Sequence, residues 1–326
     1  MKALVTGGSG FIGSAVVMEL LKRSQPMRAL VRSKEKTGNL AGLPVELVEG
    51  DLLDRDSLHR ALEGCDRVYH LAAVYANWLP DRSVILRANV DGTRNLLQAC
   101  LERKVERVVY TSSVAALGAH GKTPAGESAQ FNLADTGDTY YLSKYQAEQI
   151  AVEYAGRGLP VVILNPTNPI GPRDWKPTPT GALVLSVLKG KLPGYVDGGI
   201  NIVDVEDVAA AHVTAMEKGR PGEKYVLGNA DVSIHDYFHL IAEVGGGNAP
   251  AMRIPLPFAV ATAYLYEAVA AITHKPPLTT PGWVKVGSHY SYWDSSKAIH
   301  ELGLPQTPVR ASLKKAIDWF RDKRYL

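Results

Sequence analysis

The chain has 326 residues, 46% of them hydrophobic, and a formal net charge of +3. This length accommodates a full α/β domain and a smaller one, and the hydrophobic content can fill a large core. Basic residues alternate with acids, as in the stretch 102–107, which leaves no electrostatic footprint for nucleic-acid binding. The two cysteines, Cys65 and Cys100, lie in helix-like stretches and are expected to be reduced residues of the core.

The first predicted elements are a strand, a glycine turn and a helix. The apolar run 3–6 leads into Thr6-Gly7-Gly8-Ser9-Gly10-Phe11-Ile12-Gly13, and a helix-like stretch follows at 14–23. A strand, a tight turn and a helix N-terminus in this order form a pyrophosphate cradle. Gly7 allows the turn, Gly10 lets the backbone approach the diphosphate, and Gly13 lets the helix pack on the sheet. We therefore predict a dinucleotide site formed by Gly7, Gly10, Phe11, Ile12 and Gly13.

Further β-rich runs alternate with helical patterns down the chain, and this alternation predicts a parallel, doubly wound sheet of the α/β Rossmann class. Ligands of such sheets bind at the carboxyl ends of the strands. Because a core strand begins at Lys2, we expect no signal peptide and a cytoplasmic location. The predicted strands are 3–6, 27–32, 45–49, 67–71, 107–112 and 160–165.

Proline-rich turns after residue 165 mark a change of organisation. We assign residues 1–165, with returns near 200–227, to the dinucleotide-binding domain. A smaller substrate domain is expected at 166–199 and 228–308, and a C-terminal helix at 309–326.

The longest apolar run extends from Phe258 to Ile272 and is interrupted by Glu267. It is shorter than the roughly 20 residues that a membrane span needs, so no membrane span is expected. The run predicts a buried or substrate-lining helix, and the alternative is an interfacial helix that touches lipid.

A tyrosine and a lysine four residues apart, Tyr140 and Lys144, open a helix that is predicted to end near Ala155. This spacing puts both side chains on one helical face. A neighbouring ammonium favours the phenolate and is expected to lower the pKa of Tyr140, while Lys144 also bonds the nicotinamide ribose. Ser113, at the end of the strand 107–112, can hold the substrate oxygen that Tyr140 protonates. Ser112 is the alternative serine and Tyr141 a poorer alternative tyrosine, and both serines could instead cap a turn.

The residue at the end of the second strand selects the cofactor, because a carboxylate there binds ribose hydroxyls and an arginine pairs with a 2′-phosphate. Arg32 occupies this position, followed by Lys34 and Lys36, and favours NADP(H). If Arg32 only stacks on the adenine, NAD(H) stays open.

Two other groups of side chains can be weighed, one as a metal site and one as walls of a substrate pocket. His235 and His239 are one helical turn apart, but no third ligand is identifiable, so we predict no metal site. Six aromatic residues are candidates for substrate-pocket walls, with Trp78 and Trp175 preferred, and the competing interpretation is core packing. They are Tyr75, Trp78, Trp175, Tyr195, Tyr264 and Trp283.

With its leading threonine, the glycine turn resembles the TGxxGxxG turn of extended short-chain dehydrogenases/reductases, and Ser113, Tyr140 and Lys144 match their Ser-Tyr-Lys set. The chain most resembles the dihydroflavonol-4-reductase-like group and bacterial proteins labelled hopanoid-associated sugar epimerases, of the NAD-dependent epimerase/dehydratase family. The resemblance implies a homodimer paired through helices near 89–101 and 143–154. It also implies cofactor contacts at Asp51, Leu52, Ala72, Ala73, Pro166, Thr167 and Asn168.

The reaction can be weighed from three clues. Arg32 favours a reductase, since the resembling reductases exchange NADPH at each turnover. The resembling epimerases place an arginine just before the segment 200–205, whereas here no arginine lies between Arg173 and Arg220. The third clue points the other way, because Asn165 resembles an epimerase asparagine that contacts the sugar diphosphate.

We therefore predict an NADPH-dependent carbonyl reductase acting on a small ketone or aldehyde. One alternative is an NAD-dependent nucleotide-sugar epimerase or dehydratase. Another is a non-catalytic NADP(H)-binding regulator, against which the intact set of Ser113, Tyr140 and Lys144 argues.

Overall fold

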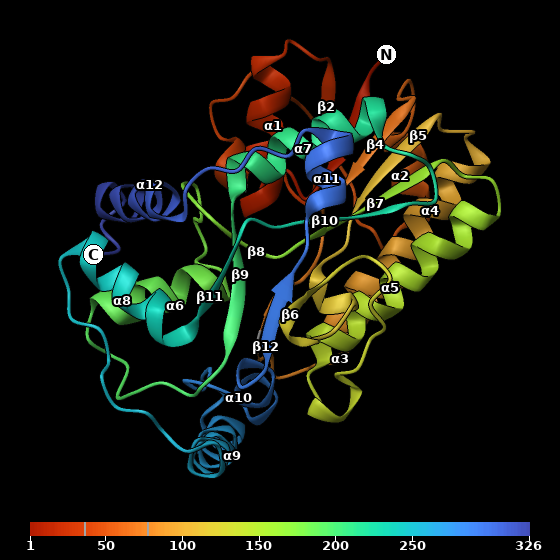
Figure 1. Cartoon of the computed structure of the whole chain (residues 1–326). Coiled ribbons are helices and arrows are strands. Elements are labelled where there is room, and N and C mark those ends of the chain that lie inside the picture. The colour runs from red at the N-terminus through yellow and green to blue at the C-terminus, as the bar shows by residue number, and fades with distance from the viewer. Residues whose placement is uncertain (36, 77) are drawn as a thin grey trace.

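A seven-stranded parallel sheet forms the centre of the computed structural model, which describes residues 1–35, 37–76 and 78–326 (Figure 1). The predicted contribution of Lys36 lies outside the described residues. The strand order is β10-β7-β5-β4-β1-β2-β3. All six predicted strands are present with ends within one residue, and a seventh joins them. Their bounds are β1 Ala3–Thr6, β2 Met27–Val31, β3 Glu46–Glu49, β4 Arg67–His70, β5 Arg107–Thr111, β7 Val161–Pro166 and β10 Lys224–Leu227.

Helices cover both faces of this sheet because successive strand side chains point to opposite sides. Val5 and Val109 belong to the core under α1, α7 and α11, whereas Leu4 and Val108 belong to the core under α2, α4 and α5. This arrangement confirms the doubly wound Rossmann fold (Figure 1). The helices are α1 Phe11–Lys22, α2 Arg55–Ala61, α4 Gly92–Glu102, α5 Thr139–Gly156, α7 Val205–Lys218 and α11 Ser296–Leu302.

The strand order reverses beside β1, because the chain places β2 and β3 on one side of it and β4 on the other. Loops leave the carboxyl ends of β1 and β4 in opposite directions at such a switch point, and a crevice opens between them. The glycine turn follows β1 directly, so it lies at this crevice.

A second sheet has the order β11-β9-β12-β6, with β8 paired to β9. It packs with α6, α8 and α12 around a separate hydrophobic core. One of its strands, β6, comes from the first 165 residues of the chain. The bounds are β6 Gly121–Ala125, β8 Asn168–Ile170, β9 Gly199–Asp204, β11 Ala230–Ser233, β12 Tyr290–Trp293, α6 Pro179–Leu188, α8 Ile234–Gly245 and α12 Val309–Asp322, with the short α3 at Ser83–Leu86.

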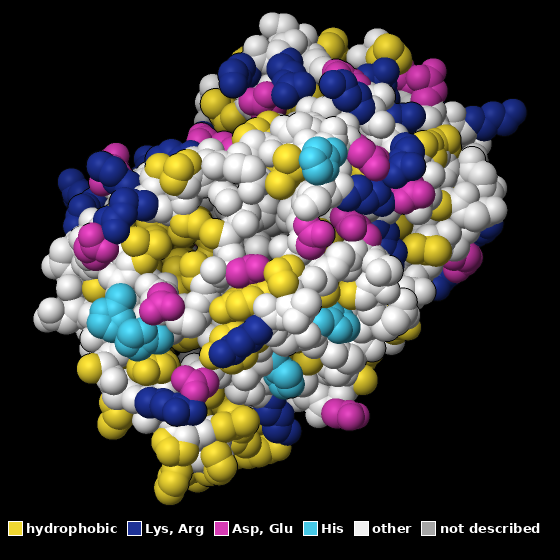
Figure 2. Space-filling model, in the orientation of Figure 1, with side chains coloured by type: hydrophobic (Ala, Val, Ile, Leu, Met, Phe, Trp, Pro, Cys, Tyr) yellow, Lys and Arg dark blue, Asp and Glu magenta, His cyan; other side chains and the backbone are white. Residues whose placement is uncertain are grey.

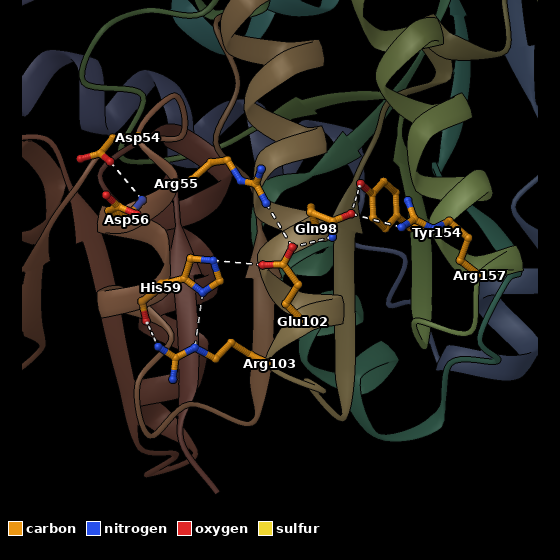
Figure 3. Close-up of polar contacts among 9 residues, drawn as sticks. All are labelled: Asp54, Arg55, Asp56, His59, Gln98, Glu102, Arg103, Tyr154 and Arg157. Atoms are coloured by element: carbon orange, nitrogen blue, oxygen red, sulfur yellow. Dashed lines mark hydrogen bonds and ion pairs between the residues drawn. The ribbon is translucent and has the colours of Figure 1, made fainter.

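Polar side chains tie α2, α4 and α5 together along the outer face of the large sheet (Figure 3). Glu102 accepts hydrogen bonds from Arg55 at 3.1 Å and from Gln98 at 2.6 Å, and it lies 3.1 Å from His59. Gln98 in turn accepts from the Tyr154 hydroxyl at 2.9 Å. One connected network therefore joins helices that come from three separate crossovers.

The preferred prediction of a buried helix for the apolar run is wrong, and the predicted burial of the two cysteines is confirmed for one of them. The apolar run forms α9, Leu256–Thr273, but only 11% of its residues are buried, since it packs on α10, Pro281–Gly287, at the edge of the molecule. Cys100 is a buried residue of α4, whereas Cys65 lies beyond the end of α2 and is only half-buried. Both thiols are free, and burial raises the pKa of Cys65.

Candidate active site

A cavity of about 730 Å³ extends from the glycine turn across the carboxyl ends of the sheet strands to the second sheet. Apart from Lys34, every described residue predicted for the cofactor or for catalysis lines it. They are Gly7, Gly10, Phe11, Ile12, Gly13, Arg32, Asp51, Leu52, Ala72, Ala73, Ser113, Tyr140, Lys144, Pro166, Thr167 and Asn168. Residues far apart in the sequence thus share one cavity.

The glycine turn has a geometry that side chains would prevent. Gly7 has a φ of 72°, and a Cβ there would come within 2.6 Å of the Ala72 backbone nitrogen. A Cβ on Gly13 would come within 2.0 Å of the Gly7 carbonyl oxygen. Gly10 is the N-cap of α1 without any side-chain cap, so the first N–H groups of this helix are left for a ligand. Such a terminus suits an anionic phosphate group.

Lys144 reaches from α5 to the end of β5, where its ammonium donates a hydrogen bond to the Thr111 carbonyl at 2.8 Å. The side chain is buried, and desolvation lowers the pKa of Lys144 to about 8. Lys144 is therefore charged at neutral pH but holds its proton less tightly than an exposed lysine.

Tyr140 stacks on Tyr75 with 4.3 Å between ring centroids. Burial raises the pKa of Tyr140 above its ordinary value of 10, and hydrogen bonding to Ser113 opposes this rise. The expectation that this pKa is lowered is wrong. The Lys144 ammonium is directed at the Thr111 carbonyl, and desolvation of the phenol dominates. Tyr140 is consequently a protonated donor at neutral pH.

The two candidate serines differ in what their hydroxyls do. Ser112 is buried and donates to Glu148 at 2.6 Å. Ser113 accepts from the Ala115 N–H at 3.1 Å and keeps its own hydroxyl hydrogen for a partner in the cavity. The geometry therefore favours Ser113 over Ser112 as the residue beside Tyr140.

Buried residues that the sequence analysis did not single out hold Ser113 and Lys144 in place, and His212 is the first of them. The Nδ1 atom of His212 lies 2.7 Å from the Val208 carbonyl, which can only accept, so Nδ1 carries the proton. Its Nε2 atom then accepts from the Thr111 hydroxyl at 2.8 Å. Burial lowers the pKa of His212 to about 4, which keeps the ring neutral. Thr111 is thus held by His212 on one side while its carbonyl holds Lys144.

Glu148, one helical turn after Lys144, is a second buried residue that holds the site in place. Its carboxylate is fully buried, lies 2.6 Å from the Lys224 ammonium and accepts from the Asn165 amide. Asn165 also donates to the Ser113 carbonyl at 3.0 Å. The i,i+4 spacing places Glu148 on the same helical face as Lys144, and this was the only hint in the sequence that Glu148 supports the site. Spacing alone could not show that Lys224, in β10, would be its ion-pair partner.

His70, at the end of β4, is held between two threonines. Its Nδ1 lies 2.8 Å from the Thr6 hydroxyl and its Nε2 3.0 Å from the Thr93 hydroxyl. Burial lowers the pKa of His70 to about 3. A neutral histidine therefore joins β1, β4 and α4 directly beneath the glycine turn.

The far end of the cavity is lined by Arg32, exposed at the end of β2, and by Asp51 after β3. Asn39 does not line the cavity, but its side chain bonds both the glycine turn and the loop after β8. Its amide donates to the Arg173 carbonyl at 2.9 Å and to the Ser9 carbonyl at 3.3 Å, and Arg173 donates back to the Asn39 carbonyl. This reciprocal pair connects the glycine turn to the loop after β8.

The aromatic candidates separate into three groups. Tyr75, Tyr195 and Trp283 line the large cavity, and Trp78 and Tyr264 line a smaller one that shares Tyr140 with it. The preference for Trp175 is wrong, because this side chain is 49% exposed and lines neither cavity.

The two histidines of the α8 start lie at the surface. His235 and His239 have ring centroids 4.4 Å apart, and the Nδ1 of His235 is 3.0 Å from Asp236.

Known proteins resemble this chain over nearly all of its length. The model of a family described as "NAD dependent epimerase/dehydratase family" matches residues 3–228. A Synechocystis protein named "Putative dihydroflavonol 4-reductase" is 41% identical, and the match covers 99% of this chain and 95% of that protein. The crystal structure of gox2253 is similar with a TM-score of 0.88 and 40% identity, covering 99% of each chain. The structure of PA4631, a nucleoside-diphosphate-sugar epimerase from Pseudomonas aeruginosa, is similar with a TM-score of 0.83 and 28% identity, covering 100% of this chain and 99% of that one.

Proposed function

This chain belongs to the NAD dependent epimerase/dehydratase family, and we propose that within it the protein is an NADPH-dependent reductase of an apolar ketone or aldehyde. The membership confirms the resemblance to extended short-chain dehydrogenases/reductases and the use of a nicotinamide cofactor. The narrower resemblance to hopanoid-associated sugar epimerases stays a prediction.

The observation that carries the proposal is the character of the part of the cavity lined by residues 178–291, where the substrate would bind. This part contains no lysine or arginine among the described residues, and Arg87, which lines the cavity elsewhere, is paired with Asp81 at 3.3 Å. A nucleotide sugar brings a diphosphate that needs cations or several N–H donors when it is buried. An apolar carbonyl compound needs neither. The wall is made of residues such as Leu183, Leu192, Val196, Ile200, Phe238 and Trp283.

Asn165 no longer supports the epimerase alternative. Its side chain is fully buried, bonds Glu148 and the Ser113 carbonyl, and does not line the cavity. The family name and the likeness to PA4631 are what remain in favour of an epimerase.

The residues of the cavity fit a dinucleotide. The α1 N-terminus and the glycine turn would hold the pyrophosphate, Asp51 and Leu52 the adenosine, and Arg32 a 2′-phosphate. Lys144 would bind the nicotinamide ribose, and Pro166, Thr167 and Asn168 would close over the ring. The bound cofactor supplies a hydride to the carbonyl carbon.

The protein side of the reaction follows from the protonation states. Ser113 would donate to the carbonyl oxygen and orient it toward Tyr140. Tyr140, a protonated phenol at neutral pH, would deliver its proton to that oxygen as negative charge develops. The Lys144 ammonium would then favour the phenolate that is left. His212 and Thr111 position Lys144 for this task.

We also propose a homodimer that pairs through α4 and α5. Their outer sides carry exposed residues such as Arg94 and Val152, and Arg94 pairs there with Glu153 at 3.5 Å. Sedimentation velocity of the wild type and of Val152→Glu tests this pairing, which predicts a dimer that the added carboxylate dissociates.

The test of the reaction uses the purified chain with NADPH, and separately NADH, against ketones and aldehydes of increasing apolar size and against nucleotide sugars. Loss of reduced-nicotinamide absorbance reports the reduction. We expect many equivalents of NADPH to be consumed with apolar carbonyl compounds. A nucleotide sugar that changes configuration without net consumption of cofactor would instead make the protein an epimerase, and binding of NADPH without any turnover would make it a regulator.

A further inference from the structure

Helix α9 is oriented with its small residues inward and its large apolar residues outward. The buried positions are Ala263 and Ala270, seven residues apart on one line of the helix. Phe258, Leu265 and Ile272 have the same spacing, and Leu265 is rotated by about 200° from Ala263. Their side chains are 72%, 68% and 81% exposed. A surface helix of a water-facing protein has the opposite orientation, with its large apolar residues in the core.

The apolar surface continues beyond this line. Tyr264, Leu265 and Tyr266 are consecutive and all exposed, so large side chains point outward over an arc of about 200°. Met252 and Leu278, just outside the helix, are exposed as well. Figure 2 shows these hydrophobic side chains gathered over α9 at the lower end of the molecule. A patch of this kind marks an interaction site.

The shape and the charge of this face identify its occupant. Side chains that radiate over such an arc form a convex ridge, which a fluid apolar medium can surround more readily than a rigid protein surface. Basic residues flank the ridge. The stretch 251–290 contains Lys275 and Lys285, and Arg253 paired with Asp197, against the single acid Glu267. Glu267 is itself paired with Arg82. Tyrosines beside the ridge suit the boundary between headgroups and acyl chains.

We propose that α9 docks this protein on the surface of an anionic lipid bilayer, with Phe258, Leu265 and Ile272 inserted among the acyl chains. Lys275 and Lys285 then lie at the level of the negative headgroups. This inference does not depend on the proposed reaction.

The helix lies on the bilayer and does not cross it, although its 18 residues are long and apolar enough to span. One side of α9 is packed against the protein through Ala263 and Ala270, and Glu267 in its middle is bound to Arg82. The chain then turns back into α10, which packs against α9. These contacts hold α9 along the protein surface, so that in the docked protein its axis lies parallel to the bilayer.

Docking in this orientation brings lipid close to the candidate active site. Trp283, Val284 and Val286 of α10 line the large cavity, and α10 packs directly on α9. A single helix therefore separates the proposed bilayer contact from the cavity. An apolar substrate dissolved in the membrane would have a short path to it.

The experiment is co-sedimentation of the full chain with vesicles of phosphatidylcholine, prepared with and without phosphatidylglycerol. We expect the wild type to sediment with the anionic vesicles. The triple variant Phe258→Ser, Leu265→Ser and Ile272→Ser should lose about tenfold or more of this binding, since three exposed apolar side chains no longer insert. Lys275→Gln with Lys285→Gln should remove the preference for phosphatidylglycerol.

A matched control replaces three exposed apolar residues elsewhere, Met18→Ser, Ile299→Ser and Leu326→Ser, and should bind as the wild type does. Thermal unfolding midpoints verify that all variants are folded. A wild type that sediments with neither vesicle, or a triple variant that binds undiminished, overturns the proposal. So does a wild-type dimer that the triple substitution dissociates in the absence of lipid binding, because it assigns the face to a second copy of the chain.

Discussion

The pKa values of Tyr140 and Lys144 both differ from the ordinary ones, and in the proposed reaction this difference gives the two residues separate roles. Burial raises the pKa of the phenol and lowers that of the ammonium to about 8. The phenol therefore keeps a proton that it can deliver. The ammonium is charged at neutral pH and can stabilise the phenolate formed by that delivery.

Replacement of Tyr140 by phenylalanine removes this proton donor and leaves the ring. We expect kcat for carbonyl reduction to fall about 10²-fold or more, as for loss of a general acid, with little change in NADPH affinity. Steady-state kinetics and a fluorescence titration with NADPH measure the two quantities. Tyr141→Phe is the matched control and should retain most activity. Full activity of Tyr140→Phe would contradict the assignment.

Arg32 is the residue whose replacement tests the cofactor. Arg32→Ser removes the cation that lines the cavity at the end of β2, where we propose that the adenosine binds. Because a charge-assisted bond to a phosphate contributes about 1.5–3 kcal/mol, the Michaelis constant for NADPH should rise about tenfold or more, while that for NADH stays nearly constant. Lys34→Ser, on the same loop, should have the smaller effect. Equal changes for both cofactors would mean that Arg32 does not contact a 2′-phosphate.

At the scale of elements, the turn between β1 and α1 is the most constrained segment of the site. Gly13→Ala would place a methyl group 2.0 Å from the Gly7 carbonyl oxygen, so the turn or the helix must move. We expect loss of most NADPH binding and a lower free energy of unfolding, measured by titration and by urea denaturation. Gly156→Ala, at the end of α5 in open space, is the control and should be neutral or slightly stabilising. Unaltered NADPH binding in Gly13→Ala would show that the turn relaxes easily.

Patterns over a few neighbouring residues of the sequence predicted those parts of the fold that form between residues close together in the chain. The strand and helix alternation predicted the large sheet, and the glycine spacing together with Tyr140 and Lys144 predicted one shared cavity. Periodicity identifies an apolar segment but not the elements that surround it. For that reason a buried helix was preferred over the interfacial alternative for the run that forms the exposed α9.

The supports behind the site were missed for a related reason. His212 reaches Thr111 across 101 positions of sequence, and Lys224 reaches Glu148 only because β10 pairs with β7. Trp175 was misplaced because the direction of a loop side chain depends on partners such as Tyr325, which bonds the Trp175 carbonyl. Contacts of this range follow from the closed fold and not from spacing.

Across the whole molecule, the two buried histidines make stability depend on pH. Both have a pKa below the ordinary value of 6.5, about 3 for His70 and about 4 for His212. Below about pH 6.5 the unfolded chain therefore takes up protons that the folded chain refuses, and stability is lost as the pH falls toward 4. Between pH 6.5 and 5 each histidine should cost about 2 kcal/mol of unfolding free energy.

Urea denaturation at about pH 7 and about pH 5 tests this dependence. His212→Gln cannot titrate and should lose less stability on acidification than the wild type does. His274→Gln, at an exposed position, should follow the wild type. An identical pH dependence of all three proteins would mean that His212 is protonated in the folded state as readily as in the unfolded one.

Asn39 connects the glycine turn, which lines the cavity, to Arg173 in the loop after β8. Asn39→Ala removes both side-chain bonds while leaving the carbonyl that Arg173 contacts. We expect NADPH to dissociate about two- to tenfold faster, in line with the loss of ordinary hydrogen bonds. Stopped-flow fluorescence measures this rate constant, and an unchanged value would contradict a role of the connection in retaining the cofactor.

The same connection bears on what limits the speed of the enzyme. In the proposed reduction the oxidised cofactor must leave in every cycle, and its departure past the Asn39 connection can be slower than hydride transfer. A higher kcat together with weaker NADPH affinity in Asn39→Ala would identify cofactor departure as the slow step. The hydrogen bonds of Asn39 would then lengthen the time for which the cofactor stays bound and lower kcat by the same effect. Tighter retention of the cofactor would mean fewer catalytic cycles per second.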